Sequence, residues 1–262
     1  MSQDWRAQKE RGSSFMLRLI RWIATHLGRG PTRLLLYPIT LYFLLTAGYQ
    51  RRASREFLTL ALDRPATLID LARHFHTFAS TILDRVFMMT GRFDCFEMEI
   101  HNHSLIAEQI ARKQGCVLVG SHLGSFEALR IIGLEQKELP IKILMYPQHN
   151  EMLVRILEEL NPNMNQSIIP LGQADTLIRA RESVDDGFIV GLLGDRIADS
   201  SKTVTCQFMN RPTTFSQGPI LLAHLLKVPV FLFFGLYMGG NRYEIHIEPV
   251  SYTHLTLPTT RL

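Results

Sequence analysis

Cysteine is scarce in this sequence, and the few cysteines present form no ligand or disulfide pattern. Cys95, Cys116 and Cys206 are scattered through 262 residues. An odd number of distant cysteines is typical of reduced thiols in the cytoplasm and argues against a secreted scaffold held by disulfides. Low-complexity tracts and internal repeats are also missing. With 262 residues the chain is long enough for one sizeable core, or at most one domain with an appended region.

Several catalytic signatures are absent as well. The sequence contains no Gly-x-Ser-x-Gly, no His-Glu-x-x-His, no phosphate-binding P-loop and no dinucleotide-binding glycine pattern. Their absence weakens hydrolase, zinc-protease and nucleotide-binding interpretations. Five histidines follow no metal-ligand spacing, and we interpret them as structural: His74, His76, His149, His224 and His246. We therefore expect no metal ion and no cofactor.

Positive charge is concentrated at one end of the chain, although the net charge is only +4. Residues 1–55 contain ten Lys or Arg and two acidic residues, so this stretch carries +8 and the remainder −4. A basic arm of this kind is attracted to anionic surfaces, which include both nucleic acid and anionic lipid.

The same stretch contains two apolar segments, which favour lipid over nucleic acid. Phe15–Leu27 has apolar residues at helical spacing with arginines on another side, which predicts an amphipathic helix in a headgroup layer. Leu34–Gly48 is uncharged, but as a helix it would reach about 22 Å against about 30 Å of hydrocarbon, and Pro38 would disturb it. We expect residues 1–55 to attach to a membrane surface. Burial in the core and a true membrane span are the alternatives.

Beyond residue 55 the pattern changes from helical to alternating. Residues 56–112 keep an apolar rhythm of about 3.6 residues and predict helices. After residue 115, short apolar runs alternate with helical stretches, which predicts an α/β domain with a mixed, mostly parallel sheet flanked by helices. The main expected strands are Cys116–Val119, Ile141–Tyr146, Ser167–Leu171, Phe188–Leu193, Val230–Leu236 and Tyr243–Glu248.

These patterns divide the chain into an N-terminal membrane-attachment region over residues 1–55, an α/β domain over residues 56–250, and a tail over residues 251–262. The tail has neither helical nor strand periodicity and resembles the translation of a sequencing-library adapter. We expect it to be non-native, on a domain truncated at its C-terminus, and exclude it from the functional argument.

His122 and Glu127 lie where an α/β domain usually binds its ligand. His122 follows an expected strand, and Glu127 comes five positions later, in the first turn of the next expected helix. A histidine, with a reference pKa of about 6.5, can take a proton from an alcohol, and a carboxylate at its other ring nitrogen would stabilise the imidazolium. Gly124 leaves room for a substrate, and Ser125 can cap the helix. Spacing alone is equally compatible with a structural histidine at a strand end.

The segment Gly-Ser-His-Leu-Gly-Ser-Phe-Glu at positions 120–127, placed after a hydrophobic strand, resembles the H-x4-D/E motif of the lysophospholipid acyltransferase superfamily. The likeness is closer to the late acyltransferases of lipid A biosynthesis and extends over Phe15–Val250. The resemblance implies that His122 deprotonates an acceptor hydroxyl for attack on an acyl thioester, with Glu127 in support and the substrate close to Gly124 and Ser125.

Gly194-Asp195-Arg196 resembles the second catalytic block of the same superfamily. The glycerol-phosphate acyltransferases have Glu-Gly-Thr-Arg at the comparable place, and this departure makes a glycerolipid acceptor less favoured. Arg196 can bind a phosphate or stabilise an oxyanion, and Asp195 can orient it or hold an acceptor group. By the same resemblance, Arg155 corresponds to a substrate-binding arginine and Gly218 to a loop that lines the acyl pocket. A loop-closing Asp–Arg pair and a surface arginine are the structural alternatives.

The resemblance implies transfer of a fatty acyl chain from acyl-carrier protein or acyl-CoA to a hydroxyl of lipid A or a related envelope lipid, at the cytoplasmic face of a bacterial inner membrane. The implied partners are the lipid acceptor, the thioester donor and an anionic membrane surface, without nucleic acid. Two other functions stay open. One is a non-catalytic membrane scaffold of the same fold, and the other is a metal-dependent phosphoesterase using His122, Glu127, Asp195 and Asp199.

Overall fold

The computed structural model describes residues 28–129, 140–146, 168–197 and 202–250. The chain divides into two compact units, residues 1–87 and 88–262. The expected amphipathic helix Phe15–Leu27, Arg155 and Asp199 lie outside the described residues.

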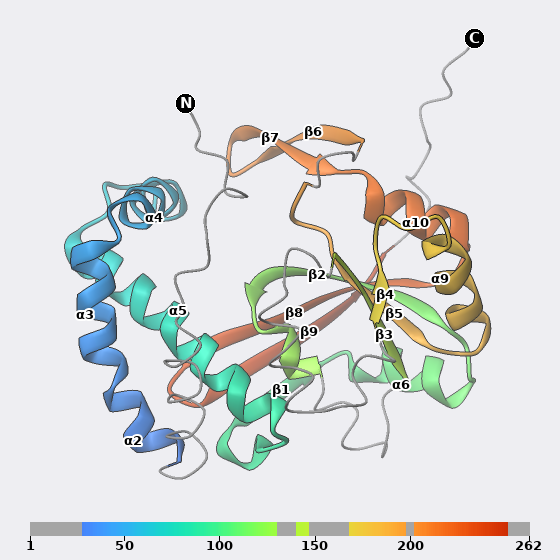
Figure 1. Ribbon diagram of the computed structural model, residues 1–262, viewed down its shortest axis with the longest axis horizontal. Helices are drawn as coiled ribbons and strands as arrows, with labels where there is room; N and C mark the ends of the chain where they lie inside the picture. Colours follow the sequence, from blue (N-terminus) through green and yellow to red (C-terminus); the bar gives the residue numbers. More distant parts are fainter. Residues whose placement is uncertain (1–27, 130–139, 147–167, 198–201, 251–262) are drawn as a thin grey trace. The chain divides into compact units, whose positions relative to one another are not determined.

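The described part of the first unit is helical (Figure 1). Its helices are α2 (Arg29–Leu34), α3 (Leu36–Thr46), α4 (Gly48–Ala61) and α5 (Leu68–Met89), whose last two residues belong to the second unit. Pro38 leaves α3 intact because it lies in the first turn, where a backbone N–H has no partner within the helix. In the parts of the chain that the structure describes, no helix has both the length and the apolar character needed to cross a bilayer.

A buried ion pair joins the beginning and the end of this unit. Asp84 on α5 has no exposed surface, and the side chain of Arg29 on α2 is 13% exposed. The guanidinium donates two hydrogen bonds to the carboxylate, from Nε to Oδ1 at 2.8 Å and from Nη2 to Oδ2 at 2.9 Å. This bidentate geometry offsets the free-energy cost of removing both charges from water. The ion pair also links α2 to α5, which are 55 residues apart in the sequence at this contact.

The second unit is built on a seven-stranded sheet with the order β1-β9-β8-β2-β5-β3-β4. Its strands are β1 (Glu97–His101), β2 (Cys116–Gly124), β3 (Ile141–Met145), β4 (Ile168–Pro170), β5 (Ile189–Leu193), β8 (Val230–Gly239) and β9 (Arg242–Pro249). Every neighbouring pair is parallel except β8 and β9, which confirms the expected mixed, mostly parallel sheet. The carboxyl ends of β2, β5 and β8 therefore meet at one edge of the sheet.

One expectation for this region was wrong. Residues 97–101, inside the stretch interpreted as helical, form the edge strand β1, which pairs with β9 about 145 residues later. Alternate residues Met98 and Ile100 pack against the core, whereas Glu97, Glu99 and His101 project from the opposite face. This two-residue period is short, and its partner strand is distant in sequence, so the neighbouring helical rhythm obscured it.

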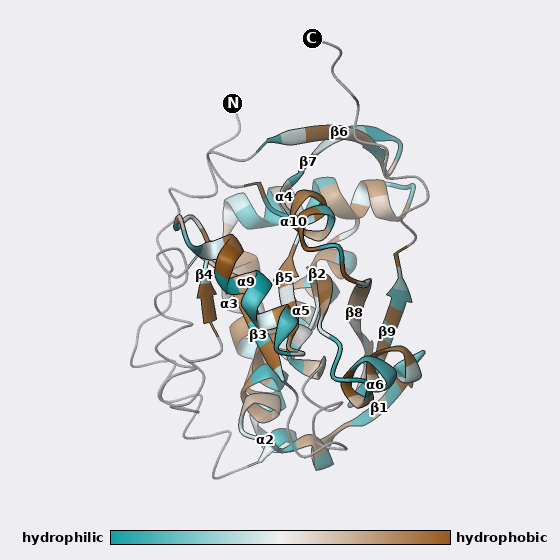
Figure 2. Cartoon of the chain, turned by 90° about the vertical axis from the view of Figure 1, so that its right-hand side faces the viewer, coloured by the Kyte–Doolittle hydropathy of each residue, from teal (hydrophilic) through white to brown (hydrophobic). Residues whose placement is uncertain are grey.

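Helices cover both faces of the sheet. On one face, α9 (Thr176–Asp185) and α10 (Gly218–Leu226) pack on apolar residues of β2, β3, β4, β5 and β8. On the other, α6 (His103–Ala111) and the 3₁₀ turn Phe126–Leu129 enclose a second core with β2, β5, β8 and β9. Figure 2 shows the resulting alternation of apolar and polar residues along β9. Where we expected a helix from Ser125, the described residues form this 3₁₀ turn, and the residues that follow it lie outside the described part of the chain.

A separate two-stranded hairpin precedes α10. Its strands are β6 (Thr203–Phe208) and β7 (Arg211–Ser216), which pair antiparallel. The connecting residues Met209 and Asn210 both have positive φ, at 51° and 58°, as the preferred two-residue hairpin turn requires.

We expect Asp84→Ala to lower the free energy of unfolding by about 3–5 kcal/mol, because it leaves the Arg29 guanidinium without its buried counter-charge. Urea denaturation followed by circular dichroism measures the loss. Asp185→Ala is the control, since Asp185 makes an exposed ion pair with Arg181 and its removal should have a much smaller effect. Equal losses in the two variants would contradict a stabilising role for the buried pair.

Candidate active site

His122 is carried outward by a bulge at the end of β2. The strand is buried from Cys116 to Leu118 and becomes exposed at His122. Its pairing with β8 shifts from Gly120 opposite Phe233 to Gly124 opposite Gly235, so the stretch of β2 between the two pairs is two residues longer than that of β8. The extra length bends the strand away from its neighbour and directs His122 to the surface.

The bulge closes through a contact between two backbones. Gly124 has a φ of +77°, and a Cβ at this position would lie 2.0 Å from the carbonyl oxygen of Gly235. The N–H of Ser125 donates to that same oxygen at 2.8 Å. A Cβ on Gly235 would in turn lie 2.2 Å from the Ser125 carbonyl oxygen. Both positions therefore require glycine.

Asp195 reaches His122 from the end of the neighbouring strand β5. The pairing of β2 with β5 ends at Gly120 opposite Leu193, and the N–H of Gly194 donates to the Gly120 carbonyl at 2.9 Å. Gly194 is confined, because a Cβ there would lie 3.1 Å from Pro219 Cγ in the first turn of α10. The chain then turns, and the Asp195 carboxylate lies beside His122.

The Asp195 carboxylate binds His122 twice. The ring Nδ1 lies 2.8 Å from Oδ1, and the backbone N–H of His122 donates to Oδ2 at 3.0 Å. Burial raises the pKa of Asp195, but the hydrogen bonds from the ring and backbone of His122, together with the charge of the ring, outweigh it and hold the pKa below its ordinary value. The carboxylate is therefore ionised at neutral pH.

This pairing determines how the imidazole can act. An ionised carboxylate only accepts hydrogen bonds, so the proton of the neutral ring resides on Nδ1 and the lone pair on Nε2. The side chains of His122 and Asp195 are 35% and 32% exposed, so a substrate can reach them. An imidazole held in this tautomer by a carboxylate can accept a proton at Nε2.

Glu127 occupies a different environment from the one we expected. The carboxylate beside the His122 ring belongs to Asp195, whereas Glu127 is 4% exposed and accepts a hydrogen bond from Ser125 Oγ at 2.9 Å. Ser125 is fully buried, and its Oγ lies 3.7 Å from Met88 Sδ. The Ser125–Glu127 pair thus lies beneath the bulge.

The other expected site residues are only partly brought together. Arg196 is exposed and directly follows Asp195. Gly218 is the first residue of α10, whose first turn contacts Gly194 through Pro219, and its N–H donates to Ser216 Oγ at 3.2 Å. The structure therefore brings the H-x4-E segment, Asp195, Arg196 and the start of α10 to one edge of the sheet.

Gly235 is a site-forming residue that the sequence interpretation missed. It interrupts the apolar run of β8, and an isolated glycine within a strand is itself a signal of a bulge or of another backbone close by. That signal could have identified the position, although not its partner.

Comparison with known protein families identifies a match for this chain. The model of the bacterial lipid A biosynthesis acyltransferase family matches residues 77–256, which is more than half of the chain and includes His122, Glu127, Asp195, Arg196 and Gly218. No curated protein matches the sequence.

We expect Gly124→Ala to lower the melting temperature by much more than Gly91→Ala. Both glycines have a φ of +77°, which costs an L-residue about 1–2 kcal/mol, but only at Gly124 would the new Cβ meet a backbone atom. Thermal denaturation by circular dichroism compares the two variants. Equal shifts would show that the backbone contact with Gly235 does not constrain the bulge.

We expect His122→Ala to raise the pKa of Asp195, because it removes a ring hydrogen bond and a charge interaction that both lower this pKa. Since the folded pKa lies below the unfolded one, the carboxylate stabilises the protein above the unfolded pKa, and this contribution is lost as the pH falls through the folded pKa. The variant should therefore lose it at a higher pH.

An NMR titration of the Asp195 carboxyl carbon measures this change. The carboxyl of Asp185, whose partner is Arg181, serves as an internal control and should not move. An unchanged Asp195 midpoint would refute the pairing with His122.

Proposed function

The chain belongs to the bacterial lipid A biosynthesis acyltransferase family, and on this premise we propose that it transfers a fatty acyl chain from a thioester to a lipid hydroxyl with His122 as general base. The proposed donor is acyl-carrier protein or acyl-CoA, and the proposed acceptor is lipid A or a related envelope lipid. The observation that carries the proposal is the His122–Asp195 pair at the carboxyl ends of two adjacent parallel strands.

In the proposed reaction His122 moves one proton and forms no covalent bond to the acyl group. Its Nε2 takes the proton of the acceptor hydroxyl as the oxygen attacks the thioester carbonyl. The attack forms the new C–O bond and leaves an oxyanion on the tetrahedral intermediate. Collapse of this intermediate restores the carbonyl, breaks the C–S bond and releases the thiolate, which receives the proton from His122. Asp195 stays ionised and stabilises the imidazolium formed between these steps.

Two further groups complete the proposed site. Arg196, exposed next to Asp195, would place its positive charge near the oxyanion of the intermediate or near a phosphate of the acceptor. Glu127 would support His122 indirectly, because its hydrogen bond with buried Ser125 holds the segment that follows the bulge. We assign Glu127 as a positioning residue in this conformation.

We further propose that the first unit attaches to an anionic membrane surface on the cytoplasmic face of the inner membrane. Helix α3 and the last residue of α2 expose large apolar side chains, among them Leu34 and Leu45, each 67% exposed, and Tyr37 at 64%. Helix α4 follows α3 in the sequence and is basic in its first half, where Gly48, Arg51, Arg52 and Arg55 line a hollow. Apolar residues beside arginines are typical of a helix that lies in the headgroup layer.

We expect His122→Ala and Asp195→Asn to reduce acyl transfer by about 10²-fold or more, because each removes part of the proton-transfer pair. The measurement is transfer of a labelled acyl chain from acyl-carrier protein to lipid A precursors, with circular dichroism to verify folding. His224→Ala, which removes an exposed histidine of α10, should leave turnover unchanged.

The same assay separates the two carboxylates. If Asp195 is the partner of the ring, Asp195→Asn should lower kcat more than Glu127→Gln; the reverse order would return that role to Glu127. Full turnover by His122→Ala would refute the mechanism, and no transfer by the unmodified chain with any lipid hydroxyl would favour the non-catalytic scaffold.

A further inference from the structure

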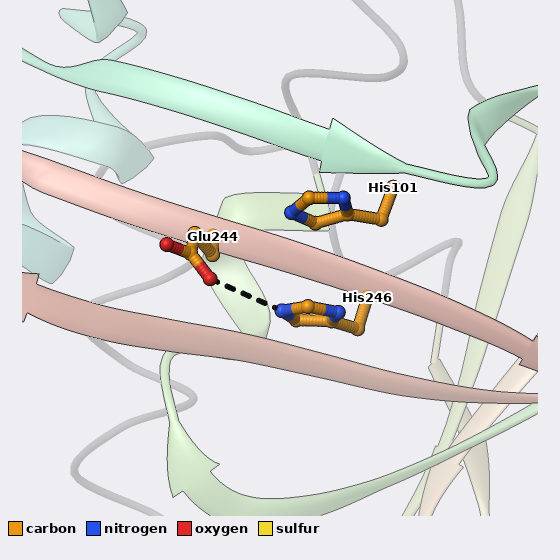
Figure 3. Close-up of side chains that lie close together, drawn as sticks. All are labelled: His101, Glu244 and His246. Carbon is orange, nitrogen blue, oxygen red and sulfur yellow. Dashed lines mark hydrogen bonds and ion pairs between the residues drawn. The ribbon is translucent and has the colours of Figure 1, made fainter.

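Two histidines, far apart in the sequence, lie directly opposite one another on the outer strands of the sheet. His101 ends β1, and its register partner on β9 is His246. Their rings are stacked, with centroids 4.4 Å apart and planes inclined by 15°. Figure 3 shows that both rings present their Nε2 edge toward the side on which Glu244 lies.

The ligand atoms of these three side chains are close enough for one ion. One ligand atom from each of His101, Glu244 and His246 lies within 4.8 Å of the other two. His246 Nε2 is 3.4 Å from Glu244 Oε2. A tetrahedral zinc site with bonds of about 2.1 Å separates its ligand atoms by about 3.4 Å, so small side-chain rotations would bring all three into coordination.

The residues around this cluster carry negative charge that no basic side chain in the strand register balances. Glu99 lies opposite Glu244 in the register, and like charges at facing positions of neighbouring strands destabilise a sheet. Glu99 Oε1 is 3.7 Å from His101 Nε2, too far for a hydrogen bond. Within the described part of the chain, His101 Nε2 is buried and has no hydrogen-bond partner. The nearest basic residue in the register, Arg242, faces Glu97 instead.

We propose that His101, Glu244 and His246 bind a divalent cation of the zinc type, with Glu99 or water as the fourth ligand. Two imidazoles and a carboxylate favour Zn²⁺ over Mg²⁺ or Ca²⁺, which prefer oxygen ligands alone. The side chains of His246 and Glu244 are 31% and 33% exposed, so an ion can enter from solution. Bound metal would fasten the edge strand β1, which among the described strands pairs with β9 alone, to the rest of the sheet.

This site is independent of the proposed acyl transfer, since β1 and β9 carry none of the residues assigned to it. The sequence interpretation, which treated His246 as structural and expected no metal, was based on ligand spacing along the chain. Spacing cannot reveal a pair created by parallel strands 145 residues apart.

The proposal is tested by removing bound metal from the full chain with a chelator and titrating it with Zn²⁺ in an isothermal titration calorimeter. We expect one Zn²⁺ per chain and no comparable heat with Mg²⁺. His101→Ala and His246→Ala should each weaken binding at least tenfold, and the double variant at least a hundredfold. His224→Ala is the matched control, because it removes an exposed histidine elsewhere and should bind Zn²⁺ like the unmodified chain.

Two additional readouts cover variants that fold poorly. Zn²⁺ should raise the melting temperature of the unmodified chain and not that of Glu244→Gln, which keeps the side-chain shape and removes the anionic ligand. Co²⁺ should give the visible absorption of a low-coordinate site in the unmodified chain. Zinc affinity in the double variant equal to that of the unmodified chain would overturn the proposal, as would a failure of the unmodified chain to bind Zn²⁺.

Discussion

The contact between the backbones of Gly124–Ser125 and Gly235 is the constraint on which the candidate active site depends. It is formed by a hydrogen bond from the Ser125 N–H and by two positions at which a Cβ would overlap a carbonyl oxygen. Because β2 is held against β8 at this point, the two additional residues before it must bulge outward. The exposed position of His122 therefore follows from main-chain packing.

The same packing separates the two carboxylates near the histidine by environment. Asp195 stands at the surface, is held ionised by its bonds to His122 and can respond to the charge of the ring. Glu127 is enclosed beneath the bulge with Ser125. One carboxylate thus contacts the imidazole at the surface, and the other is buried against the segment that carries it.

Much of this architecture could be predicted from the sequence, for identifiable reasons. The apolar runs of β2, β5 and β8 and the following polar residues are local signals, and they placed His122 and Asp195 correctly at strand ends. The carboxylate that contacts His122 could not be predicted in this way. Glu127 is only five positions away in the sequence and Asp195 is 73, but the pairing of β2 with β5 brings Asp195 to the ring. The edge strand β1 and the stacked pair of His101 and His246 were missed for the same physical reason.

The register of β2 against β5 has a consequence for misfolded molecules. The last paired residues are Gly120 and Leu193, and His122 and Asp195 each stand two positions beyond them. A slip of one residue between these strands would present Gly194 or Arg196 to the ring, neither of which offers a carboxylate. A chain with the wrong register would therefore lack the His122–Asp195 pair, so correct pairing of β2 with β5 is a condition for this site to form.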